Sequence, residues 1–198
     1  MKSKRKALLL AFSAILLVAA SVLGTYAFLT AQSQKVENTF TVGKVAITLD
    51  EAKVTAMGVV DGSERVQANS YKLIPGHSYV KDPTVHITAG SEDSWLFVRV
   101  NNGLSAIEKA GDTTIAKQME KLGWTAVAPG SDIYAYQSTV KADANIKVFE
   151  QFIVDGAKTG TDLTAYAPAT ITVEAYAVQA DGFANADAAF KAAPFPAP

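Results

Sequence analysis

The chain has 198 residues, of which 49% are hydrophobic, and it contains no cysteine. This length supports one well-packed domain, and the lack of cysteine excludes a disulfide scaffold, a thiolate zinc site and a cysteine nucleophile. The formal net charge is -1, but four cations stand together near the start, and setting these aside from the 18 Lys and Arg leaves 14 against 19 Asp and Glu. A mildly acidic body without a basic stripe argues against a nucleic-acid partner.

The N-terminus has the parts of a secretory signal peptide. A basic start, residues 2–6, precedes the uncharged apolar run ALLLAFSAILLVAASVL. Gly24 follows this run, and we expect it to end the apolar helix just before a cleavage site.

Small residues at the -3 and -1 positions mark the expected cleavage point. These are Thr25 and Ala27, which makes Phe28 the first residue of the mature protein. A second cut, after Ser21 with Ala19 at -3, is less favoured. The alternative to cleavage is a retained transmembrane helix, because an uncharged stretch of about 20 residues could span a bilayer.

Beyond the leader, hydrophobicity alternates with a period of two, which is typical of strands. In TFTVGKVAITL the alternation changes parity at Gly43, so we expect a strand with a bulge at that glycine. SWLFVRV is expected to be a central strand, in which Arg99 needs a polar partner or solvent. Pro75-Gly76, Pro83 and the Asp-Gly pairs predict turns. Further strands are predicted in KVTAMGVV, SYKLIPGHSYVKDPTVHITAG, IKVFEQFIV and ATITVEAYAV.

Two helices are predicted between strands. The segment GDTTIAKQMEKLGW has apolar residues at helical spacing, with Asp112 or Thr113 as its expected cap and Gly123 as its end. A second short helix is predicted from Asn185 to Ala192, followed by an extended tail, PFPAP.

Seven to nine short strands with turns between them predict an all-β fold, an antiparallel two-sheet sandwich with one or two short helices in its connections. A jelly roll is favoured, although the pattern does not separate it from an immunoglobulin-like topology. The predicted division is a signal peptide 1–27, an N-terminal segment 28–38, a β-sandwich domain 39–193 and an extended tail 194–198.

The sequence shows no enzyme signature. It has two histidines, His77 beside a turn and His86 on the outer face of a strand, but no HExxH zinc motif. GxSxG and the EF-hand spacing of acids are also absent. We therefore predict no catalytic residue, no metal site and no cofactor. Aromatic residues that would stack on sugars if exposed, but that more often fill a core, are Trp95, Trp124, Tyr134 and Tyr136.

The leader and the segment after it resemble the TasA/camelysin family of bacterial surface and biofilm-matrix fibre proteins. The shared pattern is G-T-x-A, an aromatic residue, a short polar run, then N-x-F-x-x-G and an alternating strand. In this sequence the pattern falls on Gly24, Thr25, Ala27, Phe28, Asn38, Phe40 and Gly43. The segments YKLIPGHSYVKDPTVHI and AYAVQADGF are similar to parts of other Gram-positive members, and together these blocks cover about half of the chain.

The resemblance implies a jelly-roll subunit that is secreted to the cell surface or extracellular matrix. A SipW-type signal peptidase would process it, and the uncleaved leader would be its contact with the membrane. It also implies a head-to-tail homopolymer, in which the freed N-terminal segment adds as a strand to the next subunit. The candidate residues of this polymerisation strand are Phe28, Leu29, Thr30, Ala31, Val36 and Phe40.

Three alternatives stay open. The N-terminal segment could be a disordered spacer, since FLTAQSQKVE alternates only weakly. The protein could instead be a monomeric surface module that binds a carbohydrate or a protein through aromatic residues. Some relatives carry a metallopeptidase label, an activity for which this sequence has no recognisable zinc motif.

Overall fold

The computed structural model describes the backbone of residues 2–29 and 42–196, and the side chains of residues 3–18 and 42–196. The chain divides into two compact units between Thr41 and Val42. The first contains one helix, α1 (Lys2–Leu29), whose described side chains are all exposed. The expected helix end at Gly24 is wrong, because α1 continues through it to Leu29. A glycine inside a helix costs only about 1 kcal/mol of helix stability, and the Ala and Leu residues before Gly24 are strong helix formers. No helix within the described residues is long and apolar enough to cross a membrane.

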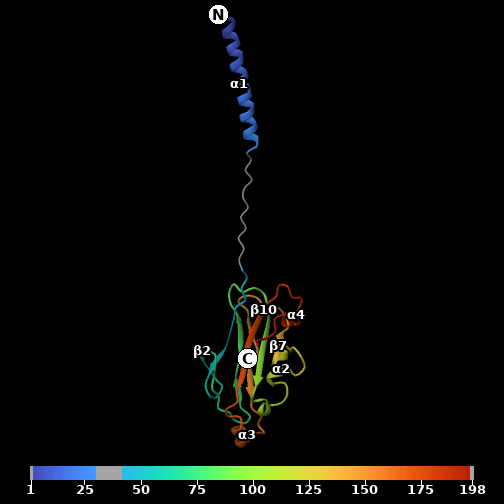
Figure 1. Ribbon diagram of the computed structural model, residues 1–198. Coiled ribbons are helices and arrows are strands. Elements are labelled where there is room, and N and C mark those ends of the chain that lie inside the picture. Colours follow the sequence, from blue (N-terminus) through green and yellow to red (C-terminus); the bar gives the residue numbers. More distant parts are fainter. Residues whose placement is uncertain (1, 30–41, 197–198) are drawn as a thin grey trace. The chain divides into compact units, whose positions relative to one another are not determined.

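The second unit is an all-β, antiparallel two-sheet sandwich, as predicted (Figure 1). One sheet has the order β2-β1-β4-β8 and consists of β2 (Val60–Val66), β1 (Ile47–Val54), β4 (Thr84–Ile87) and β8 (Asn145–Lys147). The other has the order β10-β5-β7-β6 and consists of β10 (Ile171–Gln179), β5 (Ser94–Asn102), β7 (Ile133–Tyr136) and β6 (Trp124–Ala126). A separate pair joins β3 (Ser78–Val80) to β9 (Gln151–Ile153).

Helices lie in the connections of the sandwich. They are the 3-10 helix η1 (Ser105–Ile107), α2 (Ile115–Lys121), α3 (Gly160–Thr164) and α4 (Ala186–Ala192). Asn185 caps α4, in agreement with the predicted start of that helix. The cap of α2 is Thr114, whose side chain accepts a hydrogen bond from the Lys117 amide, so the expected caps at Asp112 or Thr113 are wrong by one or two residues. The expected stop of α2 at Gly123 is correct, since that residue has a φ of 91° directly after the C-cap.

The alternation along β5 shows how the core is built. Leu96 and Val98 point between the sheets into the main core, whereas Phe97 points outward into a second cluster under α4. Both faces of this sheet are therefore covered, as expected for a central strand. Arg99 lies on the outer face and donates to Glu174 (2.8 Å) and to the carbonyl of Pro196 (2.9 Å), so it has the polar partners that the sequence required.

Several expected strands differ from the structure. KVTAMGVV holds the last two residues of β1, the hairpin turn of residues 55–59 and the first residue of β2. In this turn Gly58 has a φ of 69°, and a Cβ there would lie 2.6 Å from the Cα of Tyr79. Residues 42–46 precede β1 and are not in a strand, so the expected strand with a bulge at Gly43 is wrong over that part. IKVFEQFIV forms two strands, β8 and β9, in different sheets. The short strands β6 and β7 were not predicted.

Candidate functional site

The predicted cleavage site and donor strand fall mostly outside the described structure. Thr25, Ala27, Phe28 and Leu29 lie in the last two turns of α1. The other candidate residues of the donor strand lie outside the described residues: Thr30, Ala31, Val36 and Phe40. The described body therefore presents only the surface to which such a strand would add.

The outermost strand of the β10-β5-β7-β6 sheet has an open edge. Among the described strands β10 pairs only with β5, in register over all nine of its residues. Ala180 continues this ladder, because its amide donates to the Asp93 carbonyl at 2.7 Å. In an antiparallel ladder, hydrogen-bonded pairs alternate with pairs that are not hydrogen-bonded. The even-numbered residues of β10 therefore bond to β5, and the odd-numbered residues turn their backbone N–H and C=O groups to the open side.

The hydrogen bonds of β5 agree with this assignment. Ser94, opposite Gln179, exchanges both backbone hydrogen bonds with Val140 on its other side. Val100, opposite Val173, likewise donates its amide to Asp132, away from β10. The residues of β10 whose peptide groups face the open edge are thus Ile171, Val173, Ala175, Ala177 and Gln179.

The other sheet of the sandwich also ends in a strand with little cover. β10 contacts β1 of that sheet, and β2 lies beyond β1 at the margin of the same sheet (Figure 1). Every residue of β2 except the last is exposed, so no described strand covers either face of β2.

The apolar side chains on the inner face of β10 are incompletely covered. Ile171, Val173, Ala175 and Ala177 pack against the main core but are only half-buried. A neighbouring strand on the open side would remove more of this surface from water. This edge combines peptide groups that pair with no described strand and half-buried apolar side chains, which are the two features that β-strand addition uses.

A polar network covers the outer face of the β2-β1-β4-β8 sheet. His86 extends outward, as predicted, with Nε2 at 2.8 Å from Oδ1 of Asp50 and Nδ1 beside Oδ1 of Asn145. Arg65 donates to Asp50 and to Asp82. Burial raises the pKa of Asp50, but the hydrogen bonds from Arg65 and His86 outweigh it and hold this pKa below its ordinary value. These side chains satisfy one another, which fits a structural role.

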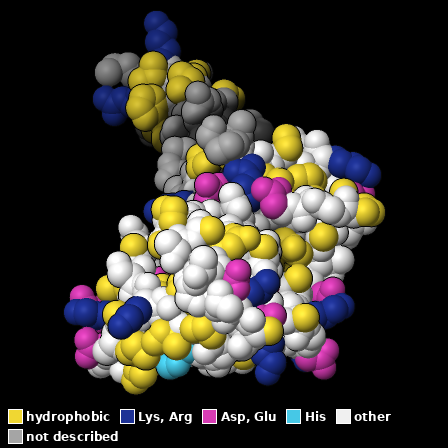
Figure 2. Space-filling model, turned by 90° about the horizontal axis from the view of Figure 1, so that it is seen from below, with side chains coloured by type: hydrophobic (Ala, Val, Ile, Leu, Met, Phe, Trp, Pro, Cys, Tyr) yellow, Lys and Arg dark blue, Asp and Glu magenta, His cyan; other side chains and the backbone are white. Residues whose placement is uncertain are grey.

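The second histidine lies elsewhere. Nε2 of His77 is 2.8 Å from the carbonyl oxygen of Met57, and its ring packs edge-on against Tyr79. Within the described residues, no group of three His, Asp or Glu side chains could hold a metal ion. Figure 2 shows a face of the molecule on which basic and acidic side chains are interspersed, without an extended patch of one sign over the body.

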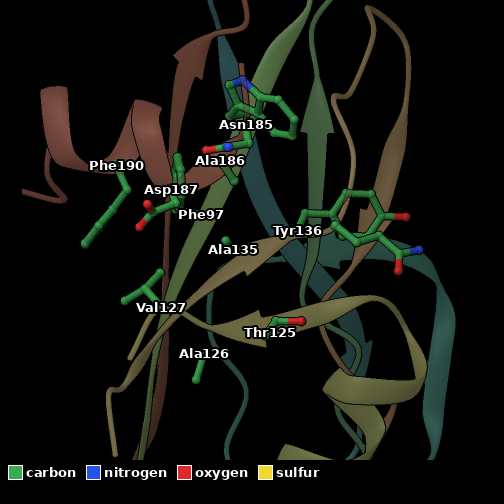
Figure 3. Close-up of a pocket in the computed structure, with 12 residues that line it drawn as sticks. Phe97, Thr125, Ala126, Val127, Ala135, Tyr136, Asn185, Ala186, Asp187 and Phe190 are labelled. Carbon is green, nitrogen blue, oxygen red and sulfur yellow. The ribbon is translucent and has the colours of Figure 1, made fainter. Parts of the chain in front are cut away.

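A pocket of about 320 Å³ lies where α4 crosses the outer face of the β10-β5-β7-β6 sheet (Figure 3). Phe97 and Ala135 are neighbours in the β5–β7 register and belong to its lining. Asn185, Asp187 and Phe190 come from α4 and its cap, whereas Thr125, Ala126 and Val127 come from β6 and the residue after it. Trp95, Tyr136, Gln137 and Ala186 complete the lining.

The four aromatic residues singled out from the sequence have different environments. Trp124 is buried and packs against Tyr136 with 5.1 Å between ring centroids, so these two belong to the core side of the sheet. Tyr134 is half-buried against the same core. Trp95 is the exception, because it is half-buried on the outer face and packs in the cluster under α4. The sequence could not distinguish these environments without the pairing of β6 and β7.

Comparisons with known proteins found no family model, no curated protein and no solved structure that matches this chain. The function is therefore argued from the residues and geometry of the chain itself.

Proposed function

We propose that this chain is a secreted structural subunit of an extracellular fibre, which polymerises when the N-terminal segment of one subunit adds as a strand to the next. The observation that carries the proposal is the edge of β10 that no described strand pairs with, together with the exposed strand β2 at the margin of the other sheet. The leader-like N-terminus and the resemblance of the segment after it to fibre proteins support the same function.

The lengths of donor and acceptor agree. Residues 28–38 would span about 36 Å as a strand, and the nine residues of β10 span about 30 Å, at ~3.3 Å per residue. Among the described residues, those of the main core begin at Ile47. The same segment can therefore leave its own subunit without removing a described core strand. Because donor and acceptor are different surfaces, the contact is head-to-tail and forms an open filament when its rotation does not close.

The positions of the two histidines offer less support for a peptidase. His77 and His86 lie on separate elements, and each is hydrogen-bonded to neighbouring oxygen atoms. We expect the purified protein to have no proteolytic activity of its own. Casein cleavage that a chelator abolishes, and that changing either histidine to Ala also abolishes, would contradict this.

The decisive experiment removes the donor. Protein beginning at Phe28 should form filaments visible by electron microscopy, and deletion of residues 28–37 should give a soluble monomer by sedimentation. Circular dichroism should show the same β-sheet content in both. Filaments that persist after the deletion would contradict the assignment of the donor. An unfolded product would show instead that the segment belongs to the core of its own subunit.

A further inference from the structure

We propose that the pocket between α4 and the outer face of the β10-β5-β7-β6 sheet is a binding site for a neutral saccharide. This function is independent of strand addition, because the pocket lies on the outer face whereas the open edge of β10 belongs to the side of the sandwich. Its volume of about 320 Å³ is at the lower end of the range for small-molecule sites, about 300–1,000 Å³.

The hollow exists because one position in the sheet is small. Ala135 pairs with Phe97, and it contributes only a methyl group between the flanking side chains of β6 and α4 (Figure 3). Phe97 and Phe190 pack together with 5.4 Å between ring centroids, which fixes α4 against the sheet. The pocket is thus formed by the packed side chains of this face.

Hydrogen-bonding groups that line the pocket are unused. Nε1 of Trp95 is buried and has no hydrogen-bond partner in the described structure. The side chains of Thr125 and Gln137 also make no hydrogen bond with any described residue. Asn185 uses its Oδ1 to accept from the Ala188 amide at 2.9 Å, which leaves its Nδ2 donors unpaired in this part of the chain. Because Nε1 of Trp95 is inaccessible, the polar groups that a ligand can reach in this pocket are the exposed side chains of Thr125, Gln137 and Asn185.

The chemistry of these groups selects a sugar over a charged ligand. Asp187 is the one charged residue among those that line the pocket, and Lys191 neutralises it at 2.7 Å. No cation lines the pocket to bind a phosphate or a carboxylate. Aromatic surface from Trp95 and Phe190 stands beside amide and hydroxyl groups. A pyranose presents C–H faces to aromatic rings and hydroxyl groups to amides, so it matches this combination.

The network on the other sheet provides a contrast within the same protein. There Asp50, His86, Arg65 and Asn145 bond to one another. The exposed groups around the pocket form no such network with one another among the described residues.

The test uses the full chain, purified in a detergent without a sugar headgroup. Maltose, cellobiose and N,N′-diacetylchitobiose are titrated separately, with tetraglycine as a peptide control. Tryptophan fluorescence and saturation-transfer NMR report binding. At least one disaccharide should bind saturably and tetraglycine should not. Failure of all three disaccharides, or binding of tetraglycine alone, would overturn the proposal.

Variants then locate the site. Ala135→Leu fills the hollow and should weaken binding at least tenfold, whereas Thr172→Ala, on exposed surface of β10, should leave it unchanged. Asn185→Asp keeps a good helix cap but removes the amide donors, and should weaken binding about three- to tenfold. It serves as the deciding variant if Ala135→Leu does not fold by circular dichroism. A folded Asn185→Asp or Ala135→Leu protein that binds like the wild type would place the sugar elsewhere and refute the site.

Discussion

Replacing Ala175 with proline should stop fibre growth while the subunit stays folded. Ala175 lies at the middle of β10, and the ladder places its N–H on the open side, away from β5. Proline lacks this N–H, and its ring projects toward an incoming strand. Proline is tolerated on edge strands when the missing N–H faces outward. The pairing of β10 with β5 should therefore survive.

The expected effect follows from the backbone groups involved. One lost hydrogen bond is worth about 1 kcal/mol, and the carbonyl group left unpaired on the donor strand costs a further ~1–3 kcal/mol. A total of about 2–4 kcal/mol corresponds to a weakening of subunit association by roughly 30- to 1,000-fold. The free energy of unfolding of the monomer should change by less than about 1 kcal/mol, since no described hydrogen bond is removed.

Sedimentation velocity and electron microscopy would measure polymerisation, and urea titration would measure monomer stability. Ala175→Ser is the matched control, because it keeps the N–H and should polymerise like the wild type. Tyr176→Pro is the opposite control. The N–H of Tyr176 faces β5, so this change should destabilise the subunit itself. Normal filaments from folded Ala175→Pro protein would refute β10 as the acceptor edge.

Three further predictions test other parts of the molecule. Mass spectrometry of the exported protein should find Phe28 as its first residue, and an intact N-terminus in the membrane fraction would contradict cleavage after Ala27. Gln118→Met should lower the free energy of unfolding by about 3 kcal/mol in urea titration. The buried Gln118 amide bonds to two carbonyls and two backbone N–H groups, which would lose their partners. An effect below ~1 kcal/mol would show that water replaces these hydrogen bonds. Asp50→Asn should cost about 1 kcal/mol at neutral pH. The folded-state pKa of Asp50 is depressed, so its stabilisation is present above the ordinary pKa of 3.8 and is lost as the pH falls through the folded-state pKa. A difference in unfolding free energy between wild type and mutant that stays constant down to pH 2 would contradict the role of the Asp50 charge.

Local signals in the sequence predicted the elements with strong patterns. The apolar run of β5, the alternating strand β10 and the helices α2 and α4 were recognisable because their patterns are long or are bounded by residues such as Gly123 and Asn185. The outward direction of His86 followed from its position between Val85 and Ile87, and both neighbours are buried in the core.

The wrong secondary-structure predictions lie where tertiary contacts, rather than local sequence, decide between a strand and a turn. KVTAMGVV has strand composition, but the close approach of Tyr79 to Gly58 makes a turn there. IKVFEQFIV is rich in β-branched and aromatic residues and reads as one strand, yet the buried Val148 and Phe149 lie between β8 and β9, where the chain leaves one sheet for the other. Strands β6 and β7 contain three or four residues each, too few for a period to be recognised. The pocket depends on these two strands, so it could not have been predicted.

If β10 is the acceptor edge, it is already ordered before a strand arrives. An edge strand with free peptide groups would ordinarily fray, but β10 is held along its whole length by β5 and from its outer face by the C-terminal tail. Phe195 packs against Tyr176 with 5.5 Å between ring centroids, and the guanidinium of Arg99 lies 4.4 Å from the Phe195 ring while it bonds to Glu174. These contacts use the outward side chains of β10 and leave its open edge untouched. Because β10 is already ordered, an arriving strand needs to order only itself, which lowers the entropic cost of association.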